Sequence, residues 1–146
     1  MSMMHDPRDL RASILRQHLY CFVWKVFTTL HPGQRFIPAW HIEAMCQQLQ
    51  RVYDAENRRL LITVPPRHGK SICTAVAFVA WAMGHDPSLR FLVASYGQDL
   101  ANKHARDYRT VIEAPWYRSL FPAMQINPRR NTAAEIVTTS NGFRKS

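Results

Sequence analysis

The stretch Leu60-Leu61-Ile62-Thr63-Val64-Pro65-Pro66-Arg67-His68-Gly69-Lys70-Ser71 decides the expected fold. Its first five residues form a short apolar run, which is typical of a strand buried on both faces of a parallel sheet. The proline pair ends the run, and residues 71–83 then read as an apolar helix that we expect Gly84 to cap. A strand that leads through a small loop into a helix offers amide donors to an anion.

The loop carries residues suited to a nucleotide. Gly69 lets the backbone approach a ligand closely, Lys70 can reach the β- and γ-phosphates, and Ser71 can hold Mg²⁺. The usual pattern begins with glycine where this chain has Val64, so the position of these residues between strand and helix is the stronger argument. An ordinary strand-to-helix turn is the alternative interpretation.

Two other residues of the loop are Arg67 and His68. Arg67 is favoured as a group that contacts the γ-phosphate and stabilises charge in the transition state, as an arginine supplied in cis does elsewhere. Its alternative is a contact with a neighbouring carboxylate or with DNA. We expect His68 to be a loop filler.

The flanking segments predict further elements. Before the loop, apolar spacing of three and four predicts amphipathic helices over residues 8–30 and 39–54, with Pro38 in the first turn of the second. After the loop, residues 91–94 predict a second buried strand and residues 97–113 a helix. Strand, helix and strand in this order form the βαβ unit of a doubly wound sheet.

The end of the chain has a different pattern. Residues 135–139, the turn Ser140-Asn141-Gly142 and the residues from Phe143 onward predict a β-hairpin with an Asn-Gly turn.

Composition favours a polyanionic partner. The 146 residues contain 19 Lys and Arg against 10 Asp and Glu, a net charge of +9, and most of the cations are arginine. Arginine matches phosphate oxygens well, although a solvated basic surface would give the same count. The longest apolar run, residues 75–83, is far shorter than the roughly 20 residues of a membrane-spanning helix. We therefore expect a soluble, cytoplasmic chain with no membrane partner.

Residues 65–71 resemble the variant Walker A loop of the large terminase subunits of tailed bacteriophages. The similarity covers nearly the whole chain from about residue 8. Its other blocks are residues 36–41, 58–64, 94–101, 115–117 and 131–145. No single block is specific, but together they are.

That family packages viral DNA with an N-terminal ATPase joined to a nuclease. The resemblance implies an α/β fold of the P-loop NTPase type (recA/ASCE-like), with a partial parallel sheet preceded by two N-terminal helices. It divides the chain into a helical segment, residues 1–57, and the first part of the ATPase core, residues 58–146. The implied partners are double-stranded DNA, the small terminase subunit, the portal protein and, at full length, further copies of the chain, in the bacterial host cytoplasm.

The resemblance also implies the ligands, ATP and Mg²⁺, and their residues. Lys70 and Arg67 take the catalytic roles and Ser71 the metal. Trp40 and His41 fall near the family's adenine-recognition segment, although Trp40 could equally be a core aromatic at a helix start. The residues expected around the nucleotide are Trp40, His41, Pro66, His68, Gly69, Lys70, Ser71 and Ile72.

The chain departs from the family in its acids. The carboxylates after the loop are Asp86, Asp99, Asp107, Glu113 and Glu135. None follows four apolar residues, so we find neither the Walker B strand nor a nuclease cluster and expect a truncated chain or the product of a broken prophage gene. We therefore expect the chain to bind ATP with Mg²⁺ weakly and to hydrolyse it at a negligible rate. A helicase-like motor and a non-catalytic remnant that binds only nucleotide or DNA are the alternatives, and a small-molecule kinase fits poorly.

Overall fold

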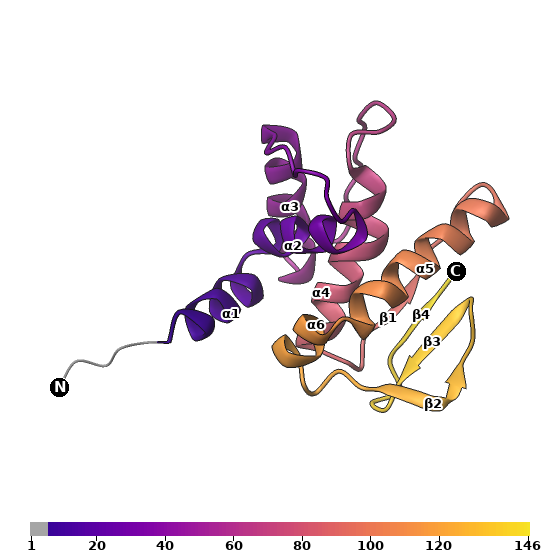
Figure 1. Cartoon of the computed structure of the whole chain (residues 1–146). Coiled ribbons are helices and arrows are strands. Elements are labelled where there is room, and N and C mark those ends of the chain that lie inside the picture. Colours follow the sequence, from indigo (N-terminus) through magenta and orange to yellow (C-terminus); the bar gives the residue numbers. More distant parts are fainter. Residues whose placement is uncertain (1–5) are drawn as a thin grey trace.

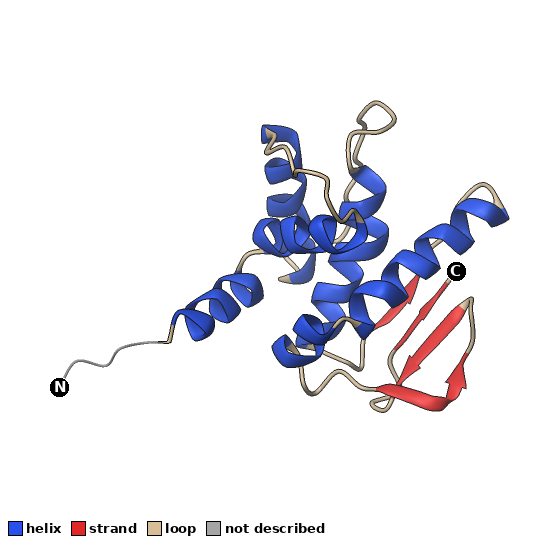
Figure 2. Ribbon diagram, in the orientation of Figure 1, coloured by secondary structure: helices blue, strands red, loops and turns tan. Residues whose placement is uncertain are grey.

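A computed structural model describes residues 6–146, so the first five residues of the expected N-terminal segment lie outside this range. The structure is α/β, with helices gathered around one central helix and a four-stranded mixed sheet on one side (Figures 1 and 2). No helix among the described residues is long and apolar enough to cross a membrane.

The N-terminal region contains one more helix than expected. Residues 8–30 form two helices, α1 (Pro7–Gln17) and α2 (Leu19–Leu30), with extended backbone at His18. The amide of Gln50 bridges the break: its Oε1 accepts from the Leu19 amide at 3.1 Å and its Nε2 donates to the Gln17 carbonyl at 3.0 Å. A side chain distant in sequence therefore replaces the helical hydrogen bonds, which apolar spacing alone does not reveal.

The second expected helix is confirmed as α3 (Trp40–Tyr53), and Pro38 lies just before it instead of in its first turn. Three of its residues, Met45, Cys46 and Leu49, are buried. Helix α3 packs against α2 and against the helix that follows the 65–71 loop.

The expected strand at residues 60–64 is not part of the sheet. This segment has no regular secondary structure and hydrogen-bonds to no strand. Leu60 and Ile62 pack against the core, whereas Leu61 is 88% exposed. The apolar run predicted burial on both faces, but the structure covers only one.

The central helix spans residues 70–85 and contains the π-helical segment η1 (Ile72–Ala77) followed by α4 (Phe78–His85). It is buried on nearly every side and contacts α2, α3 and α5. We expected Gly84 to cap this helix, but it lies inside the helix and against Phe121. A Cβ on Gly84 would meet the ring of Phe121 at 2.5 Å. Gly84 is therefore required by packing and not by helix termination.

The sheet is mixed, whereas we expected a parallel sheet. It has the order β1 (Arg90–Leu92), β4 (Phe143–Lys145), β3 (Glu135–Thr138), β2 (Ile126–Asn131), and only β1 and β4 are parallel. The expected hairpin is confirmed as β3 and β4, with Asn141 at φ 62° in its turn. Strand β2 was not anticipated and adds a second antiparallel pair.

Two helices join β1 to β2. Helix α5 (Gln98–Glu113) matches the predicted helix over residues 97–113, and the short α6 (Pro115–Leu120) begins at the proline that ends it. By register, Phe91, Ile136 and Arg144 share one face of the sheet. Arg144 stacks its guanidinium over the Tyr108 ring of α5, 5.0 Å from the centroid, so this face is the one that the helices cover.

The contact between Gly84 and Phe121 predicts a specific loss of stability. Gly84→Ala should lower the free energy of unfolding by about 1–3 kcal/mol because the added methyl overpacks the core. Urea denaturation would measure the change. Phe121→Leu in the same chain should recover part of it; strictly additive losses in the double variant would show that the ring is not what excludes the methyl.

Candidate functional site

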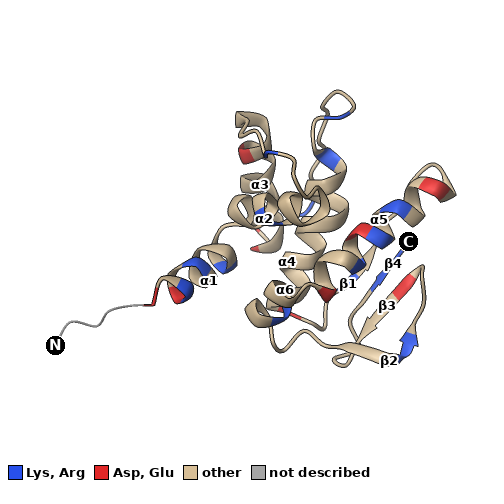
Figure 3. Cartoon of the chain, in the orientation of Figure 1, with Lys and Arg blue, Asp and Glu red and all other residues tan. Residues whose placement is uncertain are grey.

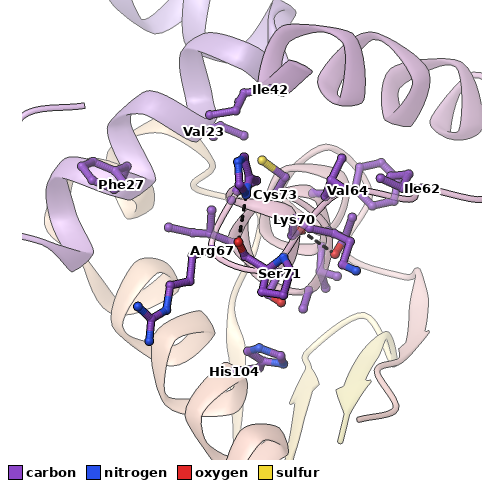
Figure 4. A pocket seen from close by; sticks show the side chains of 18 of the residues that line it. Val23, Phe27, Ile42, Ile62, Val64, Arg67, Lys70, Ser71, Cys73 and His104 are labelled. Atoms are coloured by element: carbon purple, nitrogen blue, oxygen red, sulfur yellow. Dashed lines mark hydrogen bonds between the residues drawn. The ribbon is translucent and has the colours of Figure 1, made fainter. Parts of the chain in front are cut away.

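A cleft of about 1400 Å³ opens beside the 65–71 loop (Figure 4). One wall is made by this loop, by residues 60–64 and by the first turn of α3. The opposite wall is made by β1, the residues that follow it to Tyr96, and three residues of α5: Leu100, Lys103 and His104. The cleft is large enough for a nucleotide.

The loop has the backbone geometry of an anion site. Arg67 and Gly69 have φ values of 65° and 78°, and His68 between them keeps a negative φ. Alternation of this kind turns successive N–H groups toward one side and forms a concave nest. The amides of Arg67, His68 and Gly69 donate to no other described residue. The loop thus presents three free donors beside the N-terminus of the central helix, where the helix dipole adds positive potential.

The loop is held from two sides. His68 Nδ1 lies 2.8 Å from the Pro66 carbonyl oxygen, and His41 Nε2 lies 3.3 Å from the His68 carbonyl oxygen. The two imidazole rings lie 5.5 Å apart. His68, expected to be a filler, therefore closes the turn by a hydrogen bond within the loop. The Thr74 hydroxyl donates to the Lys70 carbonyl at 2.8 Å and secures the first turn of the helix.

The charges that line the cleft are all positive. Arg35, Arg67, Lys70 and Lys103 line it, and no Asp or Glu of residues 6–146 does. Arg67 and Lys70 are exposed, so their charges are available to a ligand. The lining therefore favours an anion with several charges.

The donor set fits a phosphate chain better than it fits a metal. Ser71 is exposed at the start of the central helix and its hydroxyl could serve as one Mg²⁺ ligand. The described part of the chain holds no cluster of three His, Cys, Asp or Glu that could bind a metal. Any further ligands of Mg²⁺ here would be phosphate oxygens and water.

The two residues expected near adenine, His41 and Trp40, differ in their position relative to the cleft. His41 lines the cleft and touches the loop, whereas Trp40 is 82% exposed and stands beside the cleft without lining it. Trp40 is therefore not a core aromatic. Pro66 and Ile72 also line the cleft.

Sequence reasoning missed the polar residues of the opposite wall. His104 of α5 is 6% exposed, and its Nδ1 lies 3.4 Å from the Ser95 hydroxyl. Burial, helped by the nearby charges of Lys103 and Arg144, lowers the pKa of His104. In the sequence, a histidine at an apolar position of a predicted helix does not indicate a binding site. The fold is what places His104 in the cleft.

Arg144 of β4 was also missed. It is 1% exposed, and its guanidinium donates to the Ser146 hydroxyl at 2.6 Å and to the Ala75 carbonyl of η1 at 3.4 Å. Its Nε is buried without a hydrogen-bond partner, and no carboxylate among the described residues pairs with it. Burial lowers the pKa of this arginine. A buried cation without a counter-ion adds positive potential behind the cleft.

Comparison with known proteins gives no relative: no family profile, no curated protein and no solved structure matches the chain.

The left-handed backbone at Arg67 predicts a stabilising substitution. Arg67→Gly should raise the free energy of unfolding by about 1 kcal/mol relative to Arg67→Ala, because glycine adopts a positive φ without steric cost. Both substitutions remove the same charge, so their difference isolates the backbone term. Urea denaturation of the two variants checks it, and equal stabilities would contradict the loop geometry.

Proposed function

We propose that this chain is the ATP-binding part of a viral DNA-packaging motor of the terminase large-subunit type, with a P-loop NTPase-like core. The observation that carries the proposal is the loop between Pro65 and Ser71, where alternating φ values expose free amides at the start of a buried helix. The loop also has the sequence that resembles the terminase Walker A variant.

In this proposal, different residues of the loop bind different parts of a triphosphate. The amides of residues 67–69 donate hydrogen bonds to the phosphate oxygens, and the ammonium of Lys70 neutralises the β- and γ-phosphates. Arg67 adds a second cation at the mouth of the cleft, and Ser71 holds Mg²⁺ together with the phosphates. On the other side of the loop, His41 and the exposed ring of Trp40 are the candidates to contact adenine.

The partners belong to the same proposal. Double-stranded DNA is supported by the net charge of +9 and by Lys and Arg positions along α5 and on β1, β2 and β4 (Figure 3). The small terminase subunit, the portal protein and further copies of this chain follow from the resemblance alone, as does the bacterial host cytoplasm.

A second candidate function is nucleotide binding without turnover. The specific observation in its favour is that no carboxylate among the described residues lines the cleft. A motor needs an acidic group to hold Mg²⁺ and another to orient the attacking water. Steady-state ATP hydrolysis above that of Lys70→Ala would favour the motor, and turnover equal to that background would favour binding alone.

The central assignment can be tested at Lys70. Lys70→Ala should weaken ATP affinity by about a hundredfold or more, because a charge-assisted contact to two phosphates is lost. Fluorescent-ATP titration measures this. Lys145→Ala, which removes a lysine outside the cleft, is the matched control. Equal ATP affinity for the wild type and Lys70→Ala would remove the phosphate-loop assignment.

The DNA partner predicts a salt response. Affinity for duplex DNA should be independent of sequence, and its logarithm should fall linearly with the logarithm of salt concentration as counter-ions are released. Fluorescence anisotropy with two unrelated duplexes over about 50–200 mM salt would measure both properties. A flat response, or no binding at the lowest salt, would mean that the excess charge serves another purpose.

A further inference from the structure

The wall of the cleft that faces the loop carries a polar pair with no role in the proposal above. His104 projects from α5 into the cleft toward Ser71 (Figure 4), and Ser95, just after β1, contacts its Nδ1. Both residues line the same cleft as Lys70. They therefore face the position that the far end of a loop-bound phosphate chain would occupy.

The environment of His104 defines its hydrogen-bonding state. Its neighbours include Lys103 and Asp107 on α5 and Arg144 on β4, of which the two cations lower the pKa and Asp107 raises it. Burial acts in the same direction as the cations and is the largest cause. The imidazole is therefore neutral at pH 7. A Ser95 hydroxyl that donates to Nδ1 leaves the imidazole proton on Nε2, which makes no hydrogen bond to a described residue.

We propose that His104, oriented by Ser95, donates a hydrogen bond from Nε2 to the terminal phosphate of the nucleotide and so distinguishes a triphosphate from a diphosphate. This inference rests on the proposed nucleotide site. The loop holds the phosphates from one side, and the serine–histidine pair contacts the last of them from the other. The contact with the terminal phosphate is therefore made by α5 and by the segment that follows β1, and it is lost when that phosphate is absent.

The unneutralised charge of Arg144 strengthens this arrangement. The guanidinium lies behind the cleft, against Tyr108 and the Ala75 carbonyl, where no carboxylate of the described residues offsets it. An anion at His104 would gain from that potential.

The pair also makes binding depend on pH. A phosphate beside the ring favours the imidazolium, so the pKa of His104 is higher in the complex than in the free protein. Binding then takes up a proton, and triphosphate affinity rises as the pH falls through the neutral range. His41 and His68 also line the cleft, so only a variant of His104 assigns the effect to it.

The test compares ATP with ADP. His104→Leu should weaken ATP affinity by about tenfold while leaving ADP affinity within about twofold, because one hydrogen bond to a charged phosphate is lost. Ser95→Ala should give a smaller loss of the same selectivity. His104→Gln should retain part of the ATP affinity through its amide donor but lose the rise at low pH. Thr110→Ala, on the exposed side of the same helix, should bind both nucleotides like the wild type.

The outcomes separate this inference from the assignment on which it rests. If Lys70→Ala abolishes binding but the His104 and Ser95 variants keep the wild-type preference for ATP, the nucleotide site stands and the inference fails. Equal losses of ATP and ADP in His104→Leu also overturn it. If the wild type binds neither nucleotide, both proposals fail. Thermal denaturation monitors folding, and Ser95→Ala and His104→Gln decide the matter should His104→Leu not fold.

Discussion

The burial of the central helix is the constraint on which the rest of the structure depends. Three surrounding helices attach to it by side-chain hydrogen bonds as well as by apolar contact. Tyr117 donates to the Ala80 carbonyl at 2.6 Å, Tyr108 to the Met83 sulfur at 3.2 Å, and Trp81 of the central helix donates to the Leu15 carbonyl at 3.3 Å. Burial raises the pKa of both tyrosines, which keeps them protonated as donors. The N-terminal half of this helix lines the cleft, so the fold sets the position of the loop before any ligand is present.

The cleft has exposed charged groups at its mouth and buried polar groups deeper inside. The charges of the exposed cations at its mouth, Arg67 and Lys70, also attract an anionic ligand from a distance, and salt screens this long-range attraction. The buried guanidinium of Arg144 and the neutral imidazole of His104 lie deeper, where screening is weaker. If the proposed nucleotide site is correct, long-range attraction and the preference for a triphosphate belong to different residues, and the salt dependence of binding separates their contributions.

Local signals in the sequence were sufficient for helices α3 and α5 and for the hairpin, but not for the strand before the loop or for the division of residues 8–30 into two helices. Helix α3 and helix α5 have strong apolar periodicity, and the Asn141-Gly142 turn specifies its hairpin, so these elements were predicted from short segments. The apolar run at residues 60–64 predicted a buried strand, but this segment joins no strand of the sheet, because strand pairing depends on distant residues. The helix break at His18 depends in the same way on Gln50, thirty-two positions along the chain.

In the candidate site too, contiguous residues were predicted from the sequence, and residues from separate elements were not. The loop residues were identified because glycine, lysine and serine occur together at the start of an apolar helix. Ser95, His104 and Arg144 were not, because each belongs to a different element and only their packing brings them near the cleft or behind it. Sequence patterns located the contiguous wall of the cleft, and the wall assembled from separate elements needed the structure.

The π-helical segment η1 fixes the angular phase of the central helix. Each residue of an α-helix advances about 100° around the axis, and the i→i+5 hydrogen bonds of a π-helix wind the chain more loosely. Rewinding η1 into α-helical form would therefore turn Lys70 and Ser71 about the axis relative to the buried Val79 and Ala80. The direction in which the Lys70 side chain points over the cleft is thus set by the winding of the six residues of η1, as well as by where the helix lies.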